Sequence, residues 1–149
     1  MSYAATTGSG SAANEVRAAS GLQAISLRSG VDLVVRQGNG KSVIVRADDN
    51  ILPLVQTFVD GRGDTRTLRI RFKAREALRT KTPAVVTVDE VKLNALASSG
   101  SGSITIEALK APTLTVSISG SSNAQLREFD TEQRNISVAG SGLVRQRQA

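Results

Sequence analysis

The 149-residue sequence contains no cysteine and no histidine. Without cysteine it can form no disulfide, and it offers neither a thiolate nucleophile nor a Cys-based zinc site. Without histidine it lacks the side chain that most often acts as a general base and as a transition-metal ligand. These absences disfavour the commonest kinds of hydrolytic and metal-dependent catalysis, and we expect no cofactor. The lack of cysteine is compatible with an oxidising compartment such as the periplasm.

Aromatic residues are scarce as well, at 3% of the chain, and only three prolines occur. A core must therefore be built from Val, Ile, Leu and Ala, which suits thin layers of β-structure better than a wide sandwich with aromatic layers. No run of about 18 apolar residues is present, so the sequence predicts no transmembrane helix.

The clearest pattern lies in residues 93–145, where glycines recur 20 positions apart at 100, 120 and 140. Serines follow each of these glycines, and apolar residues keep the same interval. A short period with fixed glycines and fixed apolar positions is typical of a solenoid. The apolar sets are Leu96/Val116/Ile136, Ile104/Ala124/Val144 and Leu109/Phe129.

Within each repeat, apolar residues alternate with small polar ones, which is the pattern of a half-buried strand. Glycine then permits a corner that a residue with a Cβ resists. Coils stacked about 4.8 Å apart would place identical residues on one another. The sequence therefore predicts an all-β fold, a parallel β-helix with about 20 residues per coil in the C-terminal half. A meander of antiparallel hairpins is the alternative, which the registered repeat disfavours.

The length suits one domain. Residues 1–14 are small and polar and are predicted to form a flexible N-terminal tail, followed by a single domain over 15–149. Gln37–Lys41 and Asp60–Asp64 carry turn signals, and Pro53 predicts a bend or a single helical turn.

The formal net charge is +6, which invites an anionic partner. From Thr67 to Lys73 basic residues alternate with apolar ones, so several basic side chains would lie on one strand face, about 7 Å apart. They could form a polyanion-binding strip, or they could be solvated charges that block edge pairing, and the sequence favours the second interpretation. Nucleic acid is not indicated, because a single-strand channel needs aromatic rings among its charges and the outward positions offer none. The candidate residues are Arg66, Arg69, Arg71, Lys73 and Arg75.

Two adjacent acidic pairs, Asp48–Asp49 and Asp89–Glu90, could bind calcium. Adjacent strand residues point to opposite faces, so we interpret these pairs as solvated turn charges and expect no metal site. No serine has a histidine partner for nucleophilic catalysis, and we expect no catalytic residues.

Several short motifs follow one another along the chain in the order typical of one protein family. They are Glu15–Arg17, Gly30–Leu33, Val43–Asn50, Thr67–Arg71 and Leu93–Leu96, which runs into Ser-Gly-Ser-Gly102. In this order they resemble the putative auto-transporter adhesin, head GIN domain family, over about residues 13–145. The resemblance implies a right-handed single-stranded parallel β-helix that is usually exported to the bacterial envelope. It supplies no catalytic or binding residues to carry over. The sequence departs from the family pattern at Ser122–Asn123, where a second glycine is usual.

Together these observations predict a non-enzymatic envelope module, adhesin-like, with binding or scaffold function. The alternatives are a polyanion-binding protein for anionic glycan or lipopolysaccharide, and a glycan-processing enzyme. We expect an exported protein of the periplasm or cell surface whose signal peptide is absent from this chain. We also expect homo-oligomers through an open C-terminal end, because Arg145 and Arg147 cover little apolar area.

Overall fold

The computed structural model describes residues 5–18, 22–28, 30–36, 42–61, 66–73, 77–79, 81–89, 94–107, 110–140 and 143–148. These residues form fourteen strands and one short 3-10 helix. The elements are β1 Ala5–Thr7, β2 Ala12–Ala18, β3 Ala24–Leu27, β4 Asp32–Arg36, β5 Ser42–Asp48, η1 Leu52–Leu54, β6 Val55–Asp60, β7 Thr67–Phe72, β8 Ala77–Arg79, β9 Val85–Asp89, β10 Ala95–Ser98, β11 Ile104–Glu107, β12 Lys110–Gly120, β13 Asn123–Gly140 and β14 Leu143–Gln148.

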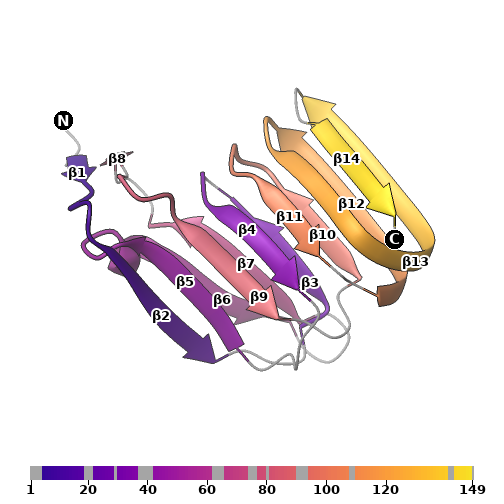
Figure 1. Ribbon diagram of the computed structural model, residues 1–149, viewed down its shortest axis with the longest axis horizontal. Coiled ribbons are helices and arrows are strands. Elements are labelled where there is room, and N and C mark those ends of the chain that lie inside the picture. Colours follow the sequence, from indigo (N-terminus) through magenta and orange to yellow (C-terminus); the bar gives the residue numbers. More distant parts are fainter. Residues whose placement is uncertain are drawn as a thin grey trace.

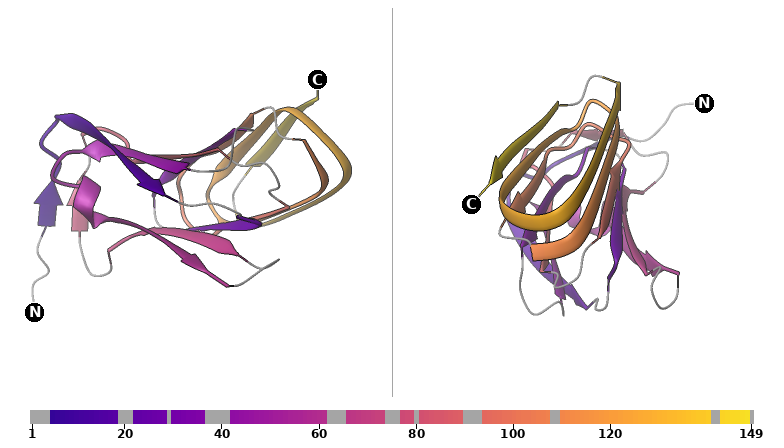
Figure 2. Two further views of the ribbon diagram at one scale, coloured as in Figure 1. Left: turned by 90° about the horizontal axis from the view of Figure 1, so that it is seen from below. Right: turned by 90° about the vertical axis from the view of Figure 1, so that its right-hand side faces the viewer.

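Two sheets form the body of the molecule (Figures 1 and 2). The first sheet has the order β2-β5-β9-β4-β11-β13-β14, and the second has the order β13-β12-β10-β3-β7-β6. The 18-residue strand β13 belongs to both, because its first half pairs with β11 and its second half with β12. Figure 2 shows this long strand bending from one layer to the other at the C-terminal end.

The predicted 20-residue interval is the pairing register of the C-terminal half. Leu96 pairs with Val116, and Val116 pairs with Ile136, in parallel strands. In the first sheet Ile104 pairs with Ala124, and Ala124 with Val144. The repeat thus positions equivalent residues side by side on neighbouring strands, as the sequence predicts for this region.

The predicted fold class is nevertheless wrong, because the all-β fold is not a right-handed single-stranded parallel β-helix. Both sheets are mixed: β2 and β9 each pair with β5 antiparallel, and β6 pairs with β7 antiparallel. The strands are also out of chain order. Strand β3 lies between β7 and β10 in the second sheet, and strand β4 lies between β9 and β11 in the first sheet (Figure 1).

The predicted β-helix is wrong because the 20-residue repeat extends over only part of the sequence. The repeat covers only the C-terminal third of the sequence, and nothing in residues 15–90 imposes a common interval. There a local turn accounts for one antiparallel pair: Gly61, at φ 93°, follows β6, and Asp60 pairs with Thr67 across the β6–β7 pair. A chain reversal of this kind favours antiparallel neighbours. The antiparallel pairs of β5 with β2 and with β9 join segments that are distant in the chain, so no local turn predicts them.

The core lies between the two sheets and is aliphatic. Leu96, Val116, Ile104 and Ala124 are buried, which confirms that these members of the predicted columns face the core. The side chains of the other members, Ile136, Val144, Leu109 and Phe129, lie outside the described residues. The other buried hydrophobic residues include Leu22, Ile25, Leu27, Val31, Leu33, Val35, Val43, Val45, Ile51, Leu68, Ile70, Val86, Val88, Ile106, Leu114, Ile118 and Leu126.

Two equivalent corners of the repeat differ in whether they accept a side chain. At Gly102 a Cβ would collide with the carbonyl of Val31, because the segment that leads into β4 passes directly beside this corner. At the equivalent position, Ser122 is accommodated and buried. Its hydroxyl lies 2.8 Å from that of Ser98 and donates to the Gly100 carbonyl at 2.9 Å. The departure from the family pattern therefore adds a buried hydroxyl pair.

The N-terminal stretch contributes strands to the fold. Within residues 1–14, where the sequence predicts a flexible tail, Ala5–Thr7 pairs parallel with β8, and Ala12 begins β2. The division into a tail and one domain stays a prediction. Pro53 lies in the 3-10 turn η1, as expected from its position.

Candidate functional site

The basic strand predicted from the sequence is β7, and its alternation is confirmed. Leu68 and Ile70 are buried, whereas Arg69 and Arg71 are half-buried on the outer face. Lys73 is exposed just beyond the strand, where its N–H donates to the Leu54 carbonyl. Arg66 is half-buried before the strand and does not share the outward alternation of Arg69 and Arg71. Arg75 lies outside the described residues.

Neighbouring strands bring further side chains to this face. Across the antiparallel pair, Phe58 of β6 lies opposite Arg69, and Gln56 lies opposite Arg71. On the other side Ser26 of β3 pairs with Arg69, and the next outward residue is Arg28. The cluster thus runs across β6, β7 and β3 rather than along β7 alone.

Short interactions orient the two β7 arginines. Arg69 Nε lies 3.1 Å from Asp60 Oδ2, and Arg71 Nε donates to Gln56 Oε1 at 3.0 Å. The Arg71 guanidinium also stacks over the Phe58 ring, 5.2 Å from its centroid, which is a cation–π distance. The ion pair of Arg69 and the hydrogen bond of Arg71 both use Nε, so within the described part of the chain the Nη groups of both arginines keep their N–H donors for a ligand, although one face of the Arg71 guanidinium is covered by Phe58.

Two hollows adjoin at Phe58 and Arg71, which line both. One, of about 210 Å³, is formed by these two residues with Ser26, Arg28 and Arg69 over Ile70. The other, of about 460 Å³, adds Arg17, Gln56 and Thr57. Phe58 and Arg71 therefore form the wall between two cationic depressions.

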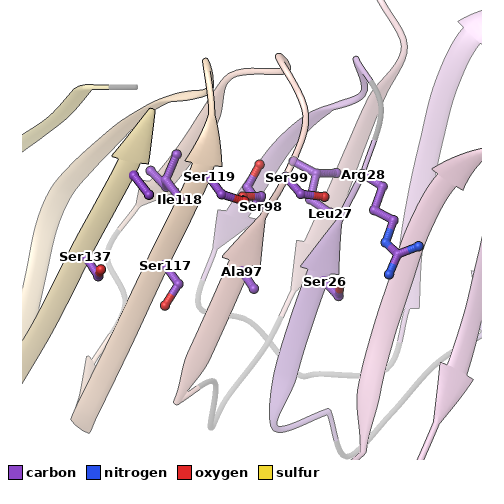
Figure 3. Close-up of a pocket in the computed structure, with 11 residues that line it drawn as sticks. Ser26, Leu27, Arg28, Ala97, Ser98, Ser99, Ser117, Ile118, Ser119 and Ser137 are labelled. Atoms are coloured by element: carbon purple, nitrogen blue, oxygen red, sulfur yellow. The ribbon is translucent and has the colours of Figure 1, made fainter. Parts of the chain in front are cut away.

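A third, shallow hollow of about 330 Å³ continues the face over the small side chains of β3, β10, β12 and β13 (Figure 3). Ser26, Ala97, Ser117 and Ser137 form one row across these strands, because they pair in register. Figure 3 shows Arg28 extending away from the serines, toward the side of β7. The outer face of the second sheet is thus cationic at one end and lined with hydroxyl groups at the other.

Sequence reasoning missed Arg17, Arg28 and Phe58. The prediction that no aromatic ring lies among the outward charges is wrong, because Phe58 comes from the neighbouring strand and is 40% exposed. The turn signal at Asp60–Asp64 could have placed Phe58 opposite Arg69, since a short turn fixes the register of its hairpin. Arg28 could not be placed, because β3 joins β7 only through the tertiary fold.

Asp48 also differs from its predicted role. The sequence favours a solvated turn charge at this position, yet the residue is fully buried. Its carboxylate accepts hydrogen bonds from the backbone N–H groups of Gly10 at 3.0 Å, Lys81 at 2.9 Å and Thr82 at 3.2 Å. A Cβ at Gly8 would collide with this carboxylate. Asp48 therefore joins the N-terminal segment to the turn before β9.

The hydrogen bonds govern the charge state of Asp48. Burial would raise the pKa of this carboxyl, and the backbone donors of Thr82, Lys81 and Gly10 outweigh that effect, so the pKa lies below its ordinary value. The carboxylate is ionised at neutral pH and serves as an acceptor for the backbone. Among the described residues, no group of three or more acidic side chains could hold a metal ion. Asp89 instead forms an ion pair with Arg36 at 3.3 Å, and Glu90 lies outside the described residues.

Residues 21–147 match the family described as "Putative auto-transporter adhesin, head GIN domain". The chain belongs to this family, which confirms the resemblance found in the sequence. No match was found among the curated proteins.

Solved structures share the fold at low sequence identity. A putative lipid binding protein from Parabacteroides distasonis has a TM-score of 0.73 at 19% identity, over 95% of this chain and 76% of the other. A putative adhesin from Bacteroides fragilis gives 0.58 at 11% identity, over 95% and 100% of the two chains. A putative adhesin from Parabacteroides distasonis gives 0.50 at 15% identity, over 97% and 100%. No helix among the described residues is long and apolar enough to cross a membrane.

Proposed function

We propose that the protein is a non-enzymatic, adhesin-like module of the bacterial cell envelope that binds anionic polymers on the outer face of its second sheet. The observation that carries this proposal is the arginine cluster, in which Arg69 and Arg71 of β7 and Arg28, just beyond β3, line one hollow beside Phe58. The envelope location and the adhesive role are supported by the family description. The ligand class is an anionic glycan or lipopolysaccharide.

The chemistry of the cluster supports binding rather than catalysis. Guanidinium groups stay protonated at all ordinary pH values, so they cannot exchange protons with a substrate. They do form paired hydrogen bonds with carboxylate, sulfate and phosphate groups. The carboxylate nearest the hollow, Asp60, is bound to Arg69 and is thus occupied as a partner of the cationic cluster.

Lipopolysaccharide is a suitable ligand because it carries phosphate groups, and an acidic glycan is suitable because it carries other anionic groups. A structure with the same fold is described as a putative lipid binding protein, and we include lipid-borne phosphates in the proposed class for that reason. Glycan and lipid phosphates share the anionic oxygen geometry that arginine recognises.

Column chromatography on immobilised heparin and on lipopolysaccharide tests the proposal. The wild type should be retained at low ionic strength and released as salt increases, because screening weakens exposed charge pairs. Arg28→Glu combined with Arg71→Glu should abolish retention. The matched control is Arg36→Glu combined with Arg46→Glu, which changes the net charge equally but on the outer face of the first sheet. Equal loss in both variants, or no retention of the wild type, would overturn the proposal.

A second comparison distinguishes a strip along β7 from a cluster across the strands. If a strip along β7 is functional, the sequence predicts that reversing Arg69, Arg71 and Lys73 to glutamate abolishes retention. The structure adds that Arg28→Glu alone should reduce retention more than Lys73→Glu alone, since Arg28 lines the hollow and Lys73 does not. A larger loss of retention for Lys73→Glu than for Arg28→Glu would instead support a binding strip along β7.

A further inference from the structure

We infer that the hollow of about 210 Å³ beside Phe58 is a subsite for one acidic sugar residue, a uronate or a sulfated hexose. Arg28 binds the anionic group, and the Phe58 ring packs against the apolar C–H face of the sugar. This inference rests on the proposed function and goes beyond it, because it names the ligand unit and the two residues that recognise it.

The charge balance of the hollow favours an anion. Three guanidinium groups, those of Arg28, Arg69 and Arg71, meet a single carboxylate, that of Asp60. Arg71 is bonded to the neutral amide of Gln56, so its charge is not compensated there. Among the described residues, the exposed guanidinium of Arg28 has no ion-pair partner. Like charges that line one hollow repel one another, and a bound anion offsets this repulsion.

Arg28 is the natural first contact for the anion. Its side chain loses no described protein partner when a ligand binds, whereas Arg69 is held by Asp60 at 3.1 Å. The Nη groups of Arg69 and Arg71 can then complete the coordination without breaking their Nε bonds. This arrangement offers several N–H donors to one carboxylate or sulfate.

Phe58 supplies the part of the site that recognises a ring. The Phe58 ring is 40% exposed and lines the same hollow as the three arginines, so an apolar surface lies directly beside the cationic groups. Its position is fixed by the pairing of Phe58 with Arg69 and by the Arg71 guanidinium 5.2 Å from its centroid. Aromatic rings present a flat apolar surface, which matches the C–H face of a pyranose.

The size of the hollow favours a single sugar unit. Pockets for drug-sized ligands have volumes of about 300–1,000 Å³, and this hollow of about 210 Å³ is smaller. The adjoining hollow with Arg17 and Arg71, of about 460 Å³, provides room for the next residue of a chain. Single-stranded nucleic acid would call for successive aromatic platforms, and among the described residues Phe58 is the sole aromatic residue lining these two hollows.

Titration calorimetry with a heparin-derived tetrasaccharide, which carries both uronate and sulfate groups, tests the subsite. Cellotetraose serves as the neutral probe of equal length. The tetrasaccharide should bind and cellotetraose should not. Arg28→Gln should weaken tetrasaccharide binding about tenfold, and Phe58→Leu about fivefold. Arg46→Gln, an exposed arginine on the other sheet, should leave the affinity unchanged.

Two further probes identify the source of the anion. Oligothymidylate and vesicles containing phosphatidylglycerol are titrated with the same variants. Phe58-dependent binding of oligothymidylate that exceeds binding of the tetrasaccharide would replace the sugar subsite by a nucleic-acid site. Binding to vesicles alone would assign the cluster to lipid phosphate.

The outcomes separate this inference from the proposed function. If the wild type is retained on heparin but Arg28→Gln and Phe58→Leu both bind the tetrasaccharide as well as the wild type, the subsite is wrong and the polyanion function stands. If no immobilised polyanion retains the wild type, the proposed function fails. Circular dichroism and thermal melts on each variant establish that both substituted proteins are folded. Should Phe58→Leu unfold, Arg28→Gln decides the matter, because Arg28 has no described partner to lose.

Discussion

At the N-terminal end of the two layers, β2, β5, β6 and β7 pair antiparallel, and polar side chains fix the backbone through specific hydrogen bonds. At the C-terminal end, β10 to β14 pair in parallel and repeated apolar columns fix the register. Asp48 and Arg17 make such hydrogen bonds in the first region, and Leu96 and Val116 belong to such columns in the second. The comparison shows that the strands of one molecule can be held in place by individual polar side chains, here called anchors, in one region and by repeated apolar contacts in another.

The anchors at the N-terminal end are long-range. Arg17 of β2 donates to the Val55 carbonyl at 2.7 Å and to Thr57 Oγ1 at 3.0 Å, so it ties the edge of the first sheet to that of the second. Asp48 joins Gly10 to Lys81 and Thr82. Because each anchor bonds several backbone groups, its loss should affect one region strongly and the other little.

Asp48→Asn should lower the melting temperature more than either Val116→Ala or Arg17→Lys. The amide retains one oxygen acceptor and brings N–H donors toward backbone N–H groups that need acceptors, which leaves buried donors unsatisfied. Thermal melts measure the loss, and Asp49→Asn is the control, since Asp49 is exposed. Similar melting temperatures for Asp48→Asn and Asp49→Asn would contradict the anchoring role of Asp48.

The same carboxylate predicts an acid response. Its pKa is lowered from the ordinary value of 3.8 in the folded protein, so its contribution to stability is present above that value. The contribution is lost as the pH falls through the lower folded pKa. Denaturant melts from pH 6 to pH 2 (roughly the window in which carboxyl groups titrate) should fall less steeply for Asp48→Asn than for the wild type. If stability falls equally with pH in the wild type and in Asp48→Asn, Asp48 does not contribute to the acid response.

Val116→Ala should cost about 1–3 kcal/mol, because it removes two methyl groups from a fully buried column. Thr115→Ala, on the outward alternation of the same strand, should cost less than about 0.5 kcal/mol. Urea melts of the pair test the repeat register of the C-terminal region. Equal costs would mean that the apolar columns do not determine it.

Arg17→Lys should cost about 1–2 kcal/mol, since lysine cannot reach two carbonyls and a hydroxyl in the fork geometry of arginine. Hydrogen exchange should become faster over residues 52–57 and stay unchanged over residues 110–120. The control is Arg46→Lys, at an exposed position of β5. Uniform acceleration along the chain would show that Arg17 acts on global rather than local stability.

The smallest expected effect concerns association at the C-terminal region. Among the described strands, β14 pairs only with β13, and the second half of β13 pairs only with β12. Unpaired strand edges are sites of further pairing, so light scattering should show an apparent molar mass that rises with protein concentration. A constant monomer mass at high concentration would contradict the predicted homo-oligomer.

The candidate site was only partly predictable. The alternation from Thr67 to Phe72 correctly placed Arg69 and Arg71 on one outward face. It could not place Arg28 beside them, because β3 precedes β7 by a long segment and pairs with it only after folding. It also could not reveal that Asp48 is buried, since its backbone donors come from two separate segments of the chain.

By itself the sequence determined the all-β class, the inward face of β7 and the 20-residue register of the C-terminal region, because alternation and repetition are local patterns that act on neighbouring residues. It did not determine β1 or the start of β2, which lie where it predicts a flexible tail. Only the tertiary structure decided the strand order, the antiparallel pairs and the insertion of β3 and β4 between later strands. The Ser103 N–H, for example, donates to Asp32 Oδ1 at 2.8 Å across 71 positions of sequence. Such contacts form because distant apolar faces are buried together and backbone groups must find partners, and no short sequence window contains both members of the pair.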